Sequence, residues 1–209
     1  MGNVAEVKFL RGYLKSDQFI GIFLEMLDNM SDGIEISYNT AGVLSHMLAD
    51  GEHLWREQQH AACDADSPGQ RPLAYTREAI GESIIAVTEK WDANSQRNIN
   101  YRSFLPILSL ITAFDSYASQ YLAAWALNNL SLVYPDKYCA LLHREGALDQ
   151  LDKALADARS PEKLLHWLQL TADRIRAHLT AQSSGAGVRA AAATQQVPLA
   201  DGEQMDTDD

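Results

Sequence analysis

The chain has 209 residues, of which 46 % are hydrophobic, and its 28 acidic and 17 basic side chains give a formal net charge of −11. This acidity argues against binding to nucleic acid or to an anionic membrane surface through a broad positive patch. We expect no signal peptide and no membrane span, because no apolar run reaches the roughly 18 to 20 residues that cross a bilayer. The only cysteines, Cys63 and Cys139, lie far apart, which predicts no disulfide framework and a reducing, intracellular location in the cytoplasm, the nucleus or both.

The first half of the chain has the apolar spacing of helices. Residues 2–7, GNVAEV, are typical of the last turns of an amphipathic helix, with no capping residue before them. A second helix follows, with Ser16 or Asp17 as its predicted cap. Its apolar stripe contains Phe19, Phe23, Met26 and Leu27. A third helix is predicted after Gly33.

The second half continues this pattern. Thr76 is the predicted cap of a helix whose apolar positions are Ile80, Ile84, Val87 and Trp91. Pro106 fits the first turn of the next helix, where its missing N–H costs nothing. No segment shows a convincing strand alternation. The sequence therefore predicts an all-α protein.

Two segments depart from the helical pattern. Residues 58–75 include CDADSPGQRP and are predicted to form an irregular insertion. From Ser183 onward the chain is small, polar and finally acidic, so residues 183–209 are predicted to be a disordered acidic tail. The predicted folded domain is residues 1–182.

The order of the helices indicates an armadillo-like α-solenoid, a right-handed superhelix of three-helix repeats. WALNNLS at residues 125–131 ends a long helix, and a turn at Gly146 follows a shorter one. Each armadillo unit has about 40 residues. GNVAEV then fits the end of a third helix from a preceding unit, and we expect an N-terminally truncated array. GVLSHM occupies the corresponding place in the next unit, which sets His46 level with Glu6.

The helices that line the concave surface of such an array commonly bind peptides. Asn3 and Glu6 lie one turn apart and share a face. An asparagine amide can donate to and accept from a peptide backbone, and a carboxylate can hold an ammonium group. Taken alone, such a pair is more often a solvated helix face. Asn39 and His46 share a face of the next concave helix, although a histidine among apolar neighbours more often packs than binds.

Other conspicuous residues are predicted to be structural. Asn128 and Asn129 belong to the repeat signature, and Arg102 is predicted to be solvated while Phe104 is in the core. The four tryptophans fall at helical apolar positions and are predicted to pack there: Trp55, Trp91, Trp125 and Trp167.

An enzyme is the least favoured class. His53, His60 and Cys63 cluster around a loop, yet their spacing matches no compact zinc pattern. The chain has neither a glycine-rich phosphate loop nor a GxSxG nucleophile elbow. We therefore expect no catalysis, no metal and no cofactor.

Four long stretches carry a family resemblance: GNVAEVKFLR, DGIEISYNTAGVLSHMLADGEHLW, WDANSQRNINYRSFLPILSL and WALNNLSLVYPDKYCALLHREGAL. Together with the ending GEQMDTDD, they resemble the Zer-one homolog branch of the Zyg-eleven family. The resemblance implies the C-terminal armadillo-like array of a substrate receptor in a cullin-two RING ubiquitin ligase. Such an array binds proteins that begin with a free glycine or another small residue, and it is not catalytic.

The same resemblance maps two family motif residues onto this chain, Asn3 and Glu6, as ligands of the peptide's amino terminus. The family's Trp-Asn-x-x-Asp set from a preceding repeat has no counterpart in the sequence. Its leucine-rich repeats and its box for cullin two and elongins B and C have none either. Those partners would be bound only through regions missing from this chain. The alternative function is a non-catalytic armadillo scaffold or adaptor that binds another peptide partner.

Overall fold

The structure is a computed structural model that describes residues 5–31, 33–51, 55, 75–91, 101–157 and 159–194. Every regular element within these ranges is a helix, which confirms the predicted all-α class. In chain order the elements are η1 (Lys8–Leu14), α2 (Asp17–Leu27), α3 (Glu35–Leu48), α5 (Arg77–Thr88), α6 (Leu105–Ile111), α7 (Tyr117–Val133), α8 (Pro135–Arg144), α9 (Ala147–Leu155) and α10 (Glu162–Thr194).

Local sequence signals set where several of these helices begin. The side chains of Ser16 and Thr76 accept hydrogen bonds from the backbone N–H three residues later, which confirms both predicted caps. Ser116 caps α7 in the same way. Pro106 lies in the first turn of α6, as predicted. Gly146, between α8 and α9, has a φ of +77°, a left-handed conformation that glycine adopts most readily.

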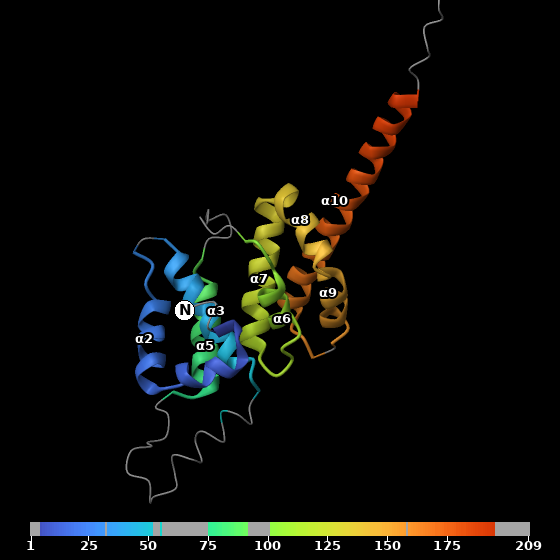
Figure 1. Cartoon of the computed structure of the whole chain (residues 1–209). Coiled ribbons are helices and arrows are strands. Elements are labelled where there is room, and N and C mark those ends of the chain that lie inside the picture. The colour runs from blue at the N-terminus through green and yellow to red at the C-terminus, as the bar shows by residue number, and fades with distance from the viewer. Residues whose placement is uncertain are drawn as a thin grey trace, which may run out of the picture.

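The helices stack side by side as a solenoid, with α2, α3 and α5 at one end and α8, α9 and α10 at the other (Figure 1). In the middle, α7 packs against α3, α5, α6, α8 and α10. This arrangement confirms the predicted all-α solenoid. None of the helices in the described ranges combines the length and the apolar character that crossing a bilayer requires.

Two hydrophobic clusters form the core, and α7 contributes to both. The first contains the inner faces of α2, α3 and α5 and includes Leu122, Trp125 and Ala126 of α7. The second contains the inner faces of α6, α8, α9 and α10 and includes Ala123, Ala124, Leu127 and Leu130 of α7. Three of the tryptophans are buried and Trp167 packs against both clusters, which confirms their packing role.

The last helix, α10, is the longest element of the described residues. α10 continues to Thr194 and projects beyond the packed helices (Figure 1). Its bounds extend past Ser183, and the predicted disordered tail stays a prediction. Residues 195–209 of the predicted tail lie outside the described residues, as do residues 58–74 of the predicted insertion.

Candidate functional site

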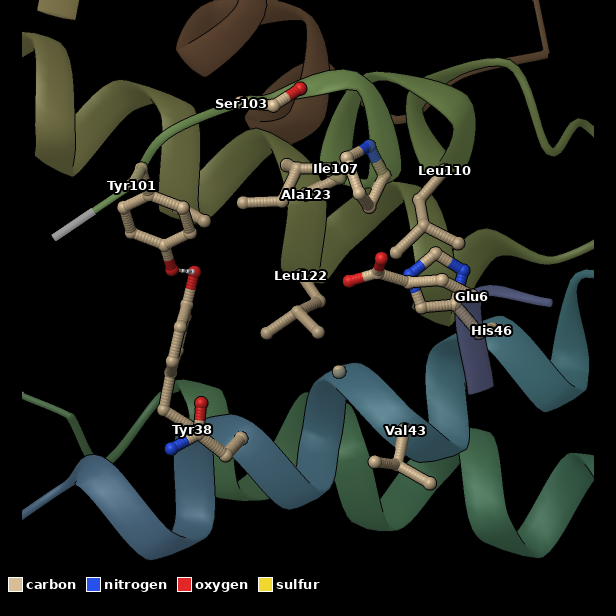
Figure 2. Close-up of a pocket in the computed structure, with 14 residues that line it drawn as sticks. Glu6, Tyr38, Val43, His46, Tyr101, Ser103, Ile107, Leu110, Leu122 and Ala123 are labelled. Carbon is tan, nitrogen blue, oxygen red and sulfur yellow. Dashed lines mark hydrogen bonds between the residues drawn. The ribbon is translucent and has the colours of Figure 1, made fainter. Parts of the chain in front are cut away.

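A pocket of about 140 Å³ lies between α3, α7, α6 and the segment that leads into α6 (Figure 2). The helical turn that contains Ala5 and Glu6, just before η1, closes one side of it. Its polar lining includes Glu6, Asn39, His46 and Ser103. Its apolar walls include Val43, Ile107, Leu110, Leu122, Ala123 and Ala126. The pocket thus combines a carboxylate with a largely hydrocarbon wall.

Three of the four predicted site residues meet in this pocket. Glu6, Asn39 and His46 all line it, although Glu6 lies more than 30 residues before the other two in the chain. Glu6 and His46 lie at the same end (Figure 2). Asn3 falls outside the described residues. Its place in the pocket therefore stays a prediction.

The opposite end of the pocket is closed by two tyrosines. The hydroxyls of Tyr38 on α3 and Tyr101 before α6 are hydrogen-bonded at 2.6 Å (Figure 2). The ring of Tyr38 also packs against Trp91 and Trp125, with centroids 5.8 Å and 6.2 Å away. These contacts fix the distance between the two walls at that end.

His46 is neutral in the folded protein. Its side chain lines the pocket, yet the residue is only 6 % exposed. Burial and the nearby Arg11 cation lower its pKa to about 4, and they outweigh the opposite effect of the Asp50 carboxylate. Within the described part of the chain, its Nδ1 atom is buried and has no hydrogen-bond partner.

Arg11 holds the turn that carries Glu6. Its guanidinium donates hydrogen bonds to the backbone carbonyls of Ala5 and Glu6, and also to that of His46 at 2.9 Å. It also pairs with the carboxylate of Asp50. Arg11 therefore positions Glu6 and His46 through hydrogen bonds to their backbone carbonyls. The side chain of Glu6 is not used in these bonds, and it is exposed in the pocket.

Asp50, two residues after the last residue of α3, anchors this arrangement. Its second carboxylate oxygen lies 2.9 Å from Nζ of Lys15, and both side chains are 3 % exposed. Burial lowers the pKa of Lys15, although its hydrogen bond to Asp50 opposes that effect. The Lys15 ammonium also lies 5.1 Å from the ring centre of Trp55.

Side chains from distant segments satisfy the C-terminal end of α3. The last four carbonyls of a helix have no partner within it. Here the carbonyls of Ser45, His46, Met47 and Leu48 accept hydrogen bonds from Ser119, Arg11, Trp55 and Arg77, respectively. The end of α3 that forms one end of the pocket is therefore fixed in place.

The sequence model of the family described as "Protein zer-1 homolog-like, C-terminal domain" matches residues 1–176. The chain belongs to this family. The "Protein zer-1 homolog" of Homo sapiens is 48 % identical over 151 residues, which cover 72 % of this chain and 18 % of the human protein. "Zyg eleven-related protein 1" of Caenorhabditis elegans is 39 % identical over 158 residues, which cover 76 % of this chain and 16 % of the worm protein.

The "Protein zer-1 homolog" of Drosophila melanogaster is 36 % identical over 189 residues, covering 77 % of this chain and 22 % of the fly protein. The chain thus spans about a fifth of the length of these zer-1 family proteins. The match to this family confirms the resemblance that was seen in the four sequence stretches.

The other residues singled out in this zer-1 family chain have structural roles where they are described. The side-chain oxygen of Asn128 accepts a hydrogen bond from Arg174 at 2.7 Å and joins α7 to α10. Arg102 is exposed and Phe104 is fully buried, as predicted. His53, His60 and Cys63 lie outside the described residues. Among the described residues, no group of three or more His, Cys, Asp or Glu side chains could hold a metal ion.

Sequence reasoning missed Arg11, Lys15 and Asp50. Each is a charged residue in a helical region, where a solvated face is the ordinary interpretation. For Arg11, the signal is the unpaired carbonyls at the end of α3, which require donors from elsewhere. Asp50 and Lys15 follow only from the need of a buried Arg11 for a carboxylate and of that carboxylate for a second cation.

Proposed function

We propose that the chain is the substrate-recognition module of a cullin-RING ubiquitin ligase receptor and binds proteins that begin with a free glycine or another small residue, for degradation. The module itself carries out no catalysis. Support comes from membership of the zer-1 family. Cullin two and elongins B and C are the proposed partners of the complete receptor, bound through regions outside this chain.

One observation carries the proposal, the presence of an exposed carboxylate in a small pocket with apolar walls. An ammonium group is stabilised by charge-assisted hydrogen bonds to a carboxylate, and these are shorter and stronger than bonds between neutral groups. The hydrocarbon wall formed by Leu110, Leu122 and Ile107 limits the access of water and so reduces screening of that attraction. Glu6 is the proposed ligand of the peptide's amino terminus.

The amide side chains have a complementary role in the proposal. Asn39 lines the pocket on α3, where its amide can both donate to and accept from the peptide backbone. Asn3 is the proposed second ligand of the amino terminus, one helical turn from Glu6. His46 contributes an uncharged wall that does not repel an ammonium group.

The test is calorimetric titration of the chain with peptides that start with Gly, Ser or Met, each with a free or an acetylated amine. We expect tighter binding of the free peptides with small first residues, and loss of that binding in Glu6→Gln. Glu25→Gln is the matched control, because Glu25 is exposed on α2 and does not line the pocket. Equal affinity for free and acetylated peptides, or unchanged affinity in Glu6→Gln, would contradict the proposal.

A scaffold or adaptor that binds another peptide partner is the second candidate, and the net charge of −11 favours basic peptides for it. The same titrations separate the two functions. A basic peptide that binds equally well with an acetylated amine, and whose affinity falls steeply with salt, would support the scaffold.

A further inference from the structure

We propose that Arg11 is a positioning residue of this pocket, and that its guanidinium fixes the turn carrying Glu6 against the end of α3 that carries His46. The inference rests on the proposed function, because it assigns to Arg11 the placement of the amine ligand. It also makes a claim about the ligand-free protein, and that claim can be tested separately.

The bonding pattern of Arg11 joins two segments that are distant in sequence. Its Nε and Nη2 atoms donate to the carbonyls of Ala5 and Glu6, the turn that precedes η1. Its Nη1 atom donates to the carbonyl of His46, 35 residues away, at 2.9 Å. A guanidinium presents five N–H donors in a rigid planar fork, and a lysine ammonium cannot reproduce this geometry.

The guanidinium is itself held in place. Asp50 pairs with Arg11 and with the buried Lys15, and the Asp50 side chain is 3 % exposed. A charged side chain locked by buried partners positions its neighbours better than one that moves in solvent. The Asp50 carboxylate also offsets the positive charge of Arg11, so that the guanidinium opposes an incoming ammonium less than a free cation would.

The charge of Arg11 has a second effect on the same pocket. The groups that face His46 are the Arg11 cation, the Asp50 carboxylate and, at the same end of the pocket, the Glu6 carboxylate (Figure 2). Burial and the Arg11 cation lower the pKa of His46 to about 4, so the imidazole is fully uncharged at neutral pH. Glu6 therefore has no imidazolium beside it, and its negative charge remains available to a ligand.

The chain offers a matched pair of variants. Arg11→Lys keeps the positive charge and removes the planar fork. Arg77→Lys makes the same change in a guanidinium that donates to the carbonyls of Leu48 and Asp115, and so touches the same end of α3 without touching the Glu6 turn. Asp50→Asn keeps the shape of the anchor but weakens its hold on Arg11, and serves if Arg11→Lys does not fold.

The first measurement is hydrogen exchange of the backbone amides of residues 5–10 without peptide. We expect exchange to rise about tenfold or more in Arg11→Lys and to stay within about twofold of wild type in Arg77→Lys. The second is the dissociation constant for a free Gly peptide, which we expect to rise about tenfold or more in Arg11→Lys only. The pKa of His46, followed by NMR, should remain low in Arg11→Lys, because burial, the larger cause, and the positive charge are both kept; a pKa near 6.5 would show that the variant has lost the packing of α3 and would overturn its use as a local probe.

Each outcome decides the proposal. Unchanged exchange in Arg11→Lys would overturn it, and so would faster exchange with unchanged peptide affinity. Equal losses of affinity in Arg11→Lys and Arg77→Lys would show a general stability effect and would also overturn it. If the wild-type chain binds no Gly peptide, the proposed function fails, while the exchange measurement still decides whether Arg11 fixes the Glu6 turn.

Discussion

Replacing Asp50 with alanine should destabilise the protein far more than replacing a surface acid. Its carboxylate accepts hydrogen bonds from Arg11 and Lys15, and the exposed fractions of these three side chains are 3 %, 11 % and 3 % for Asp50, Arg11 and Lys15, respectively. Breaking a buried ion pair by removing one partner costs about 3–5 kcal/mol, because the other charge stays buried without compensation. Arg11 keeps its backbone carbonyls and Lys15 can lose its proton, so we expect the lower end, about 3 kcal/mol.

The assay is urea unfolding of Asp50→Ala, with Asp28→Ala as the control. The ion pair of Asp28 with Lys90 has exposed fractions of 78 % and 63 %, so its loss should cost less than about 1 kcal/mol. The stability of Asp50→Ala should also rise as the pH is raised from neutral. The folded-state pKa of Lys15 lies below its unfolded value. At pH values between these two pKa values the unfolded chain binds more protons than the folded chain, so stability increases with pH there. A loss in Asp50→Ala no larger than that in Asp28→Ala would refute the reasoning.

Three further predictions concern stability alone. The folded pKa of His46, about 4, lies below its usual 6.5, so the unfolded state binds the proton first and stability should fall by up to about 3 kcal/mol from pH 6.5 to pH 4. Urea unfolding across that pH range should show a smaller fall in the stability of His46→Leu than in that of the wild type, and an equal fall in both would contradict this. Leu127→Ala, in the fully buried centre of α7, should cost about 2–5 kcal/mol, whereas Leu132→Ala at an exposed site should change urea stability by less than about 0.5 kcal/mol. Gly146→Ala should cost about 1–2 kcal/mol because of the left-handed φ of +77°, and an unchanged melting temperature would show that the turn relaxes.

The sequence predicts most of the fold because its signals are local. The caps at Ser16 and Thr76, the proline at the start of α6 and the glycine before α9 each act within one turn of the chain. The segment after Ser183 carries conflicting local signals, because its small and polar residues favour disorder while its alanines favour a helix.

The site could be predicted only in part. The repeat period of about 40 residues placed Glu6 level with His46, and both line the pocket. Arg11 and Asp50 lie 39 positions apart, close to the same period, but they were missed because a charged side chain is ordinarily expected in solvent and nothing local marks these two as buried. The Tyr38–Tyr101 hydrogen bond joins residues 63 positions apart. Contacts of this kind depend on the packing of whole helices.

The position of α7 between the two hydrophobic clusters also constrains how this array can evolve. Leu122 and Ala126 belong to one cluster, while Ala123 and Leu127, the residues that follow them, belong to the other. A change in the tilt or rotation of α7 that improves packing on one side therefore disturbs the other. Accepted substitutions on this helix should come with compensating changes on both of its neighbours, whereas substitutions on the inner face of α2, which contributes to one cluster only, should need compensation on one side.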